Sequence, residues 1–196
     1  MTGRVLVIGP GWVGDMIMSQ VMYSCLRSRD PGMVLNVLAP QSTLNLVQRM
    51  PEVDKGILIE QRHGELGLGY RLELGKLLAK EKYDQAIVTQ NSLKSSLVPL
   101  FAGIPRRTGF LGEYRYFLLN DIKILDEMRL PLMVDRFLAL VDEERAGMIE
   151  RRLTIDPLNQ ERMLHHFKLK QNRSITVFCP GAEFGDAKKW PESHYA

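Results

Sequence analysis

The sequence has little cysteine and no long apolar run, and each absence narrows the class of protein. Only two of its 196 residues are cysteines, Cys25 and Cys179. They lie far apart and match no metal-binding or redox spacing, so we predict reduced thiols and no disulfide-stapled fold. No stretch approaches the roughly 18 consecutive apolar residues of a membrane span, and the first residues form no cleavable signal pattern. A cytoplasmic location is therefore the default prediction.

A strong excess of charge of either sign is also absent. Lysine and arginine number 26 and aspartate and glutamate 23, which gives a net charge of +3. This balance is too weakly basic to predict a nucleic-acid partner, although it is compatible with a negatively charged substrate or membrane surface. A hydrophobic content of 45% is typical of a globular protein, and the length suffices for one domain with part of a second.

The stretch from Val5 to Asp15, VLVIGPGWVGD, contains the strongest local signal. Four consecutive apolar residues, 5–8, predict a strand that is covered on both faces of a parallel sheet. A Gly-Pro-Gly turn ends this strand, and apolar residues then recur at helical spacing from Val13 onward. The first N–H groups of a helix lack partners within the helix, so the junction favours anions.

Strand and helix patterns alternate along the next hundred residues. Strands are predicted over 34–39, 56–60 and 84–89, and helices over about 42–50, 70–82 and 92–102. The helix over 70–82 has Leu72, Leu74, Leu77 and Leu78 for its buried stripe, and the helix over 92–102 has Asn91-Ser92 as its N-cap. The pattern is less regular from 104 to 125, and a helix over about 131–144 closes the domain. This order predicts a doubly wound, Rossmann-like parallel α/β sheet with ligands at the carboxyl ends of its strands.

The composition shifts after this domain. A charged helix and a basic stretch are predicted within residues 145–173. One more apolar strand is predicted over Ser174 to Cys179, and it is followed by a loop and by a helix that begins at Pro191. One strand and the start of a helix cannot bury their own apolar faces. We therefore predict an N-terminal domain over 1–150, a linker region over 151–173 and the beginning of a second α/β domain over 174–196, in a truncated chain. The alternative is that the strand extends the first sheet.

Gly9, Gly11 and Gly14 spell G-x-G-x-x-G, the fingerprint of dinucleotide binding. That fingerprint also requires an acidic residue at the end of the second strand to hold the ribose hydroxyls. The second predicted strand ends in Leu38-Ala39-Pro40, so a nicotinamide or flavin cofactor is disfavoured. Glycines that serve only a tight turn and close packing are the stronger alternative.

Asp15 has two interpretations. An acidic residue in the first turn of a helix can simply complement the helix dipole, which contributes about 0.3 to 1 kcal/mol. Its position after the first strand, where such folds place reactive groups, favours a catalytic role instead. A carboxylate kept ionised by a helix N-terminus can act as general base toward a sugar hydroxyl.

Polar residues also follow the fourth predicted strand. Asn91, Ser92 and Lys94 should open onto the same edge of the sheet as Asp15, and amide, hydroxyl and ammonium groups together suit a sugar. The competing interpretation is helix capping with a solvated lysine. Arg106, Arg107 and Arg115 could add positive potential, or each could be an ordinary surface charge. His165 and His166 are predicted on an exposed helix, and we predict no metal site.

The loop PGAEFGDAKKWP from Pro180 precedes the last predicted helix. Lys188 and backbone N–H groups in such a loop could hold a diphosphate. An ordinary strand-to-helix connection is the alternative.

Taken together, these pieces resemble the ADP-heptose:lipopolysaccharide heptosyltransferases of glycosyltransferase family 9, and within them the type II enzymes. The motifs that carry the resemblance span almost the whole chain. They are VIGPGWVGDMIMSQ from Val7, MPEV from Met50, NSLKSSLVPLFAGIPRRTGF from Asn91, GEYRYFLLND from Gly112, PLMVDRF from Pro131 and FCPGAEFGDAKKWPESHYA from Phe178.

The resemblance implies an inverting, metal-independent GT-B glycosyltransferase that needs no cofactor. It would move L-glycero-D-manno-heptose from ADP-heptose to the first heptose of the lipopolysaccharide inner core, with peripheral contact at the inner face of the inner membrane. The N-terminal domain would bind the acceptor, heptosyl-Kdo2-lipid A, and the C-terminal domain the nucleotide sugar. No nucleic acid is implied.

The resemblance also assigns residues to these roles. Asp15 falls on the family's catalytic aspartate, the general base, and Lys188 on its phosphate-binding lysine. The acceptor side would comprise Trp12, Gly14, Asn91, Ser92, Lys94 and Arg115, and the donor side Lys188, Glu183 and Trp190.

One departure from the family pattern bears on activity. The family's donor domain continues into an Asp-Ser-Gly segment followed by a histidine that helps to bind the ADP-sugar, and none of that region is in this chain. We therefore expect the chain alone not to catalyse transfer. Two other classes stay open, a nucleotide- or dinucleotide-binding Rossmann enzyme and a non-catalytic saccharide-binding module.

Overall fold

The computed structural model describes residues 3–60, 66–142, 152–170, 174–181 and 186–194. The chain divides into two compact units, Met1–Thr154 and Ile155–Ala196, each of which is considered by itself. Among the described residues, no helix is both long and apolar enough to cross a membrane.

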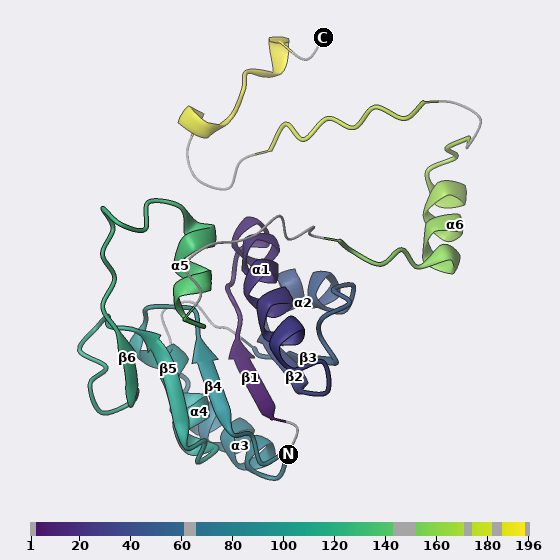
Figure 1. The fold of residues 1–196 in the computed structure, drawn as a ribbon. Coiled ribbons are helices and arrows are strands. Elements are labelled where there is room, and N and C mark those ends of the chain that lie inside the picture. The colour runs from purple at the N-terminus through teal and green to yellow at the C-terminus, as the bar shows by residue number, and fades with distance from the viewer. Residues whose placement is uncertain (1–2, 61–65, 143–151, 171–173, 182–185, 195–196) are drawn as a thin grey trace. The chain divides into compact units, whose positions relative to one another are not determined.

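The described part of the first unit is built on a parallel sheet of six strands in the order β3-β2-β1-β4-β5-β6 (Figure 1). Ile8 of β1 lies opposite Leu38 of β2 and Val88 of β4, so the carboxyl ends of three neighbouring strands lie at the same edge. The strands are β1 Arg4–Ile8, β2 Val34–Ala39, β3 Lys55–Leu58, β4 Gln85–Val88, β5 Arg106–Phe110 and β6 Asp121–Lys123. The predicted doubly wound parallel α/β sheet is confirmed.

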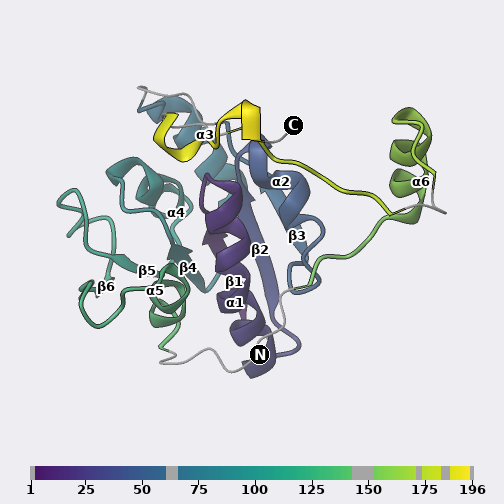
Figure 2. The ribbon, with the colours of Figure 1, turned by 90° about the horizontal axis from the view of Figure 1, so that it is seen from above.

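Helices cover both faces of this sheet. Residues of α1, α2 and α5 pack into one buried cluster and residues of α3 and α4 into another. Figure 2 shows α4 and α5 on opposite sides of β4 and β5. The helical elements of this unit are α1 Val13–Arg29, α2 Gln41–Val47, α3 Leu68–Ala79, the 3-10 turn η1 Leu93–Ser96, α4 Leu97–Phe101 and α5 Met133–Ala139.

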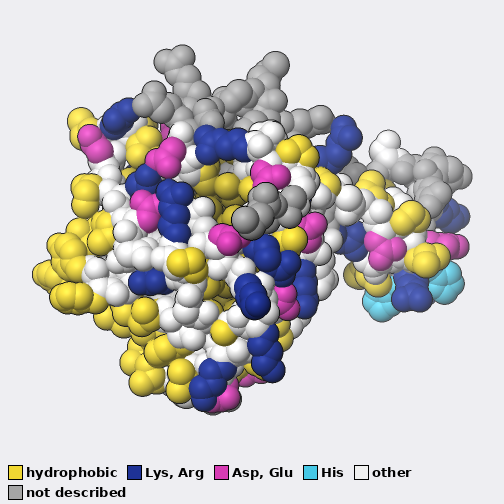
Figure 3. Space-filling view, turned by 60° about the horizontal axis from the view of Figure 1, so that its bottom comes forward, with side chains coloured by type: hydrophobic (Ala, Val, Ile, Leu, Met, Phe, Trp, Pro, Cys, Tyr) yellow, Lys and Arg dark blue, Asp and Glu magenta, His cyan; other side chains and the backbone are white. Residues whose placement is uncertain are grey.

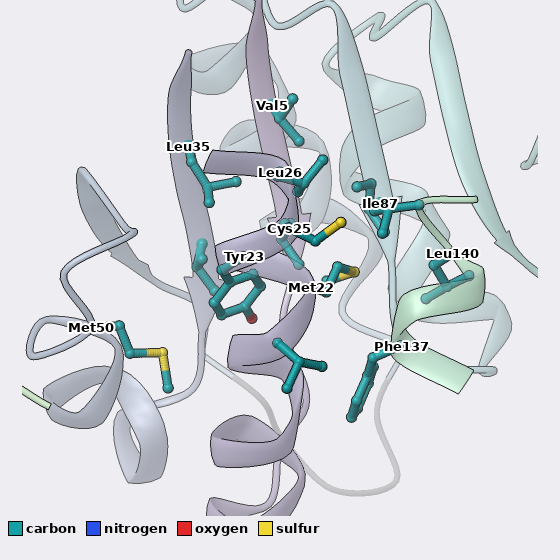
Figure 4. Packing of buried hydrophobic residues seen from close by; sticks show 14 of the residues in the cluster. Val5, Met22, Tyr23, Cys25, Leu26, Leu35, Met50, Ile87, Phe137 and Leu140 are labelled. Carbon is teal, nitrogen blue, oxygen red and sulfur yellow. The ribbon is translucent and has the colours of Figure 1, made fainter. Parts of the chain in front are cut away.

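The two clusters follow from the alternation of side chains along each strand. Val5 and Val7 of β1 belong to the first cluster, whereas Leu6 and Ile8 belong to the second. All four are buried, as the uninterrupted apolar run predicts for a strand covered on both faces. In Figure 4, side chains of α1 and α5, among them Met22, Tyr23, Leu26 and Phe137, fill the first cluster together with Leu140, which follows α5.

Several predicted elements differ from the structure. The helix predicted over 92–102 begins as the 3-10 turn η1 and becomes α-helical only at Leu97. In α3, Leu78 is buried and Leu74 packs against the second cluster, but Leu72 and Leu77 are exposed. α3 approaches α4 closely at Gly75, where an added Cβ would lie 2.5 Å from the Phe101 Cβ.

Charged side chains are mixed over the surface. On the face drawn in Figure 3, lysine and arginine are interspersed with aspartate and glutamate, and some hydrophobic side chains are exposed. Ion pairs such as Arg4–Glu81 and Arg106–Asp121 account for part of this mixing. The small net charge thus comes from local balance.

The second unit contains α6 Pro157–His166 and the 3-10 turns η2 Asp186–Lys188 and η3 Glu192–His194. Asp156 caps α6 by accepting a hydrogen bond from the Asn159 N–H at 3.1 Å. His165 and His166 are exposed on this helix, as predicted. The division of the chain into a linker and a second domain stays a prediction.

Residues 174–179 do not form the predicted strand, and they do not extend the first sheet either. Their apolar pattern is typical of a strand, but a strand also needs a neighbour for its backbone hydrogen bonds. No such neighbour lies among the described residues, and the segment is exposed.

Candidate functional site

The strand order places one switch point in the sheet. The chain leaves β1 toward β2 on one side and leaves β4 toward β5 on the other, and β1 and β4 are neighbours. In open parallel sheets, ligands bind outside the carboxyl ends of the strands at such a point. Two segments meet there, residues 9–15 after β1 and residues 89–94 after β4.

Gly9 begins the first of these segments and is required by close packing. A Cβ at this position would lie 2.7 Å from Met16 Cε, 3.0 Å from Val37 Cγ1 and 3.2 Å from the Leu38 carbonyl oxygen. At Gly14, in contrast, an added Cβ would meet nothing within 4 Å. This contrast favours the packing interpretation of the glycine motif. The fully buried Leu38 and Ala39 at the end of β2 offer no ribose-binding acid.

Asp15 is the third residue of α1, within the turn whose free N–H groups favour negative charge. Trp12 is the N-cap residue, but its side chain makes no capping hydrogen bond. The Asp15 carboxylate is half-buried. Within the described part of the chain it has no hydrogen bond or ion pair. Asp15 therefore has an acceptor group available to a ligand.

The segment after β4 carries three of the predicted residues. Asn91 is exposed, and Ser92 and Lys94 are half-buried. The side chains of Asn91 and Lys94 have no hydrogen-bond or ion-pair partner among the residues described. The hydroxyl oxygen of Ser92 is buried without a partner among those residues. These groups are consistent with a polar ligand beside β4.

Asn91 and Ser92 do not cap the helix that follows them, contrary to the prediction. Ser92 occupies the N-cap position of η1 but makes no side-chain capping bond. The Leu93 N–H instead donates to Glu113 Oε2 at 2.5 Å. A carboxylate from the β5–β6 loop therefore performs the cap, which frees the side chain of Asn91.

Arg115, predicted to contact the acceptor, is fully buried and cannot do so in this structure. Its Nη1 donates to the Gln90 carbonyl oxygen at 2.7 Å, to Ser96 Oγ at 3.0 Å and to Ser95 Oγ at 3.1 Å. Its Nη2 donates to the Phe110 carbonyl oxygen. Burial lowers the pKa of the guanidinium, because desolvation disfavours the charged form. Arg115 therefore holds the segment after β4 in place through hydrogen bonds.

Arg106 and Arg107 also have partners within the protein. Arg106 pairs with Asp121 at 2.8 Å. Arg107 donates to the carbonyl oxygens of Leu118 and Ile104, at 2.8 and 2.7 Å. Both arginines therefore fasten β5 to its surroundings.

Gln90 belongs to the site, although sequence reasoning did not select it. Its Nε2 donates to the Gly9 carbonyl oxygen at 2.7 Å. The neighbouring Thr89 Oγ1 donates to the Ile8 carbonyl oxygen at 2.8 Å. The end of β4 therefore holds the turn that leads to Asp15. A polar residue directly after a predicted strand is the only signal in the sequence.

The predicted donor residues lie in the second unit. Lys188 is exposed, and the Trp190 ring stacks on His194 with centroids 5.5 Å apart. Glu183 lies outside the described residues. Over the described ranges, no group of three or more histidine, cysteine, aspartate or glutamate side chains could hold a metal ion.

Comparison with known proteins gives a consistent set of relatives. A family model described as "Glycosyltransferase family 9 (heptosyltransferase)" matches residues 71–196. The chain is 45% identical over 98% of its length to lipopolysaccharide heptosyltransferase 2 of Escherichia coli strain K12, and 44% identical over 98% to lipooligosaccharide heptosyltransferase 2 of Haemophilus influenzae. It spans 58% of the length of both relatives.

A solved structure shows the same relationship. The fold matches that of E. coli ADP-heptose lps heptosyltransferase II with a TM-score of 0.87 and 44% identity. The match covers 98% of this chain and 59% of that one.

Proposed function

The chain belongs to glycosyltransferase family 9 (heptosyltransferase), and from this premise we propose that it provides the acceptor-binding side of an enzyme of lipopolysaccharide core synthesis. The donor would be ADP-L-glycero-D-manno-heptose and the acceptor the first heptose of heptosyl-Kdo2-lipid A. The names of the relatives at 45% and 44% identity support this choice of substrates.

The observation that carries the proposal is the placement of Asp15. The carboxylate lies beside the switch point, in the first turn of α1, and no described residue occupies it. A carboxylate oxygen in this position can accept a proton from a hydroxyl group. Asn91 and Lys94 follow the neighbouring strand and supply an amide and a positive charge for a hydroxylated, anionic acceptor.

The chemical step then follows from these groups. The Asp15 carboxylate takes the proton of an acceptor hydroxyl as the hydroxyl oxygen attacks the anomeric carbon of the donor heptose. The bond between that carbon and the ADP oxygen breaks, and ADP leaves with the electron pair. Attack from the face opposite the leaving group inverts the anomeric configuration. A positioned general base typically contributes about 10² to 10⁴ in rate.

The donor side of the proposal concerns the second unit. Lys188 would hold the diphosphate through its ammonium group, with Glu183 and Trp190 beside the nucleotide sugar. Because the chain spans 58% of the E. coli relative, we expect the chain alone to bind the acceptor and not to transfer heptose. Peripheral contact with the inner membrane is proposed only because the acceptor is lipid-linked.

The experiment that tests this function uses the chain extended by the C-terminal residues of the E. coli relative, called here the extended chain. We expect it to release ADP from ADP-heptose and to add one heptose to heptosyl-Kdo2-lipid A, as measured by mass spectrometry. Failure of the extended chain to transfer heptose, while it still binds ADP-heptose, would favour a non-catalytic saccharide-binding module. Binding of NADH would favour the dinucleotide alternative.

A further inference from the structure

The loop between β5 and β6 is fastened to the segment that follows β4 by a buried arginine. Arg115 donates to the carbonyl oxygens of Gln90 and Ser92 and to two serine hydroxyls of η1. Burying a charged group is costly unless its donors are satisfied. Nη1 and Nη2 of Arg115 have acceptors, Nε has none among the described residues, and the charge of the Glu113 carboxylate offsets part of the cost of burial. The rigid fork of arginine holds several acceptors in one fixed arrangement, which lysine cannot do.

The same loop approaches the segment after β4 at two further points. Glu113 accepts the Leu93 N–H, and a Cβ at Gly112 would lie 2.7 Å from the Asn91 carbonyl oxygen. Glu113 and Tyr114 have φ values of 45° and 54°, a conformation that residues other than glycine rarely adopt. Such backbone strain persists only where the surroundings over-determine it. The loop is therefore shaped to fit the segment that contains Asn91.

Gln90 connects this arrangement to the turn before Asp15. Its backbone carbonyl accepts from Arg115 Nη1, and its side chain donates to the Gly9 carbonyl oxygen. A continuous set of hydrogen bonds therefore runs from Arg115 through Gln90 to Gly9. Beside the pairing of β1 with β4 and the bond from Thr89 to Ile8, this pair of residues adds a direct link between the two segments that meet at the switch point.

We propose that Arg115 and Gln90 are positioning residues that set the distance between the Asp15 carboxylate and an acceptor sugar held beside Asn91. This inference rests on the proposed function. Neither residue needs to touch the substrate, because each acts through the backbone that it holds. Transfer is sensitive to this geometry, since a misplacement of about 1 Å can cost about 100-fold in rate.

The first test is amide hydrogen exchange on the chain as it exists. Arg115→Lys should raise exchange about tenfold both in residues 91–96 and in residues 9–15, and Gln90→Leu should raise it mainly in residues 9–15. Exchange in β1 and β2 should stay unchanged. The matched control is Arg106→Lys at the start of β5, which leads into the loop; Arg106 is exposed, its ion pair is with Asp121, and it makes no contact with the segment after β4 among the described residues. A rise confined to residues 91–96 in Arg115→Lys would overturn the proposed link.

The second test is kinetic and uses the extended chain. Each single variant should lower kcat/KM for the acceptor about 100-fold, with less than about a twofold change in KM for ADP-heptose. The double variant should be no worse than the more impaired single variant, because both break the same link. Additive losses would refute the inference. Absence of transfer by the unmodified extended chain would refute the proposed function instead, and the exchange result would still decide the link.

Discussion

Substitution of Gly9 by alanine tests whether close packing dictates the turn before Asp15. The new Cβ would lie 2.7 Å from Met16 Cε, 3.0 Å from Val37 Cγ1 and 3.2 Å from the Leu38 carbonyl oxygen. The methionine methyl can move aside at little cost. Val37 is a buried, β-branched side chain and the carbonyl belongs to β2, so these two contacts must be relieved by backbone movement.

Overpacking of this kind typically costs about 1 to 3 kcal/mol. Because the Met16 methyl can move aside, we expect Gly9→Ala to lower the free energy of unfolding by about 1 to 2 kcal/mol. Gly14→Ala is the matched control, because its Cβ would enter open space in the first turn of α1. Alanine should there stabilise the helix by about 0.5 kcal/mol. Neither glycine has a left-handed φ, so conformational strain does not enter the comparison.

The assay is urea unfolding of the chain followed by circular dichroism, with the free energies extrapolated to water. The expected order of stability is Gly14→Ala, then the unmodified chain, then Gly9→Ala. A Gly9→Ala variant as stable as the unmodified chain would refute the packing interpretation of this turn. Equal destabilisation by both substitutions would refute it as well.

Three further predictions concern other parts of the molecule. Gly75→Ala should destabilise by about 3 kcal/mol in the same assay, because its Cβ would meet the Phe101 Cβ at 2.5 Å and the backbone carbonyl carbon at 3.0 Å; a loss below that of Gly9→Ala would contradict this. Burial raises the pKa of Asp54, but the Leu35 N–H and Arg27 outweigh it and hold the pKa below its ordinary value. The stability from Asp54 is therefore present above the unfolded pKa of about 3.9 and lost as the pH falls through the folded value, so Asp54→Asn should flatten the acid limb of a stability–pH curve. The chain alone should show no change in NADH fluorescence on titration, and saturable binding would revive the dinucleotide alternative.

Local patterns predicted the part of the fold that local forces determine. The apolar run of β1, the glycine turn and the helical spacing of α1 are contiguous, so the position of Asp15 at the carboxyl end of β1 followed from the sequence. The alternation of elements likewise predicted that Asn91 would follow a neighbouring strand. The parallel order of the strands then brings these two segments to one switch point.

The roles of Arg115 and Glu113 could not be predicted in this way. The sequence shows their charges, but all partners of Arg115 Nη1 lie 19 to 25 residues earlier, in η1 and after β4. Carbonyl oxygens are present at every residue, so no residue type identifies them as partners. The capping of η1 by Glu113 is hidden for the same reason, since a serine stands at the N-cap position and indicates a local cap. The apolar pattern over residues 174–179 predicted a strand wrongly, because such a pattern does not show whether a neighbouring strand is present to pair with it.

The proposed role of Asp15 as general base is tested most directly by replacement of one carboxylate oxygen. Asp15→Asn in the extended chain removes the base but keeps the shape of the side chain. Asp135→Asn is the matched control, because Asp135 is also the third residue of its helix, is also half-buried and belongs to α5, which follows β6 and neither of the two strands at the switch point. Both variants lose the same favourable interaction with a helix N-terminus.

The measurement is kcat for heptose transfer together with the dissociation constant for ADP-heptose. We predict that Asp15→Asn lowers kcat by about 10² to 10⁴ and leaves ADP-heptose affinity within about twofold, whereas Asp135→Asn changes neither. Transfer by Asp15→Asn at the rate of the Asp135→Asn control would contradict the account.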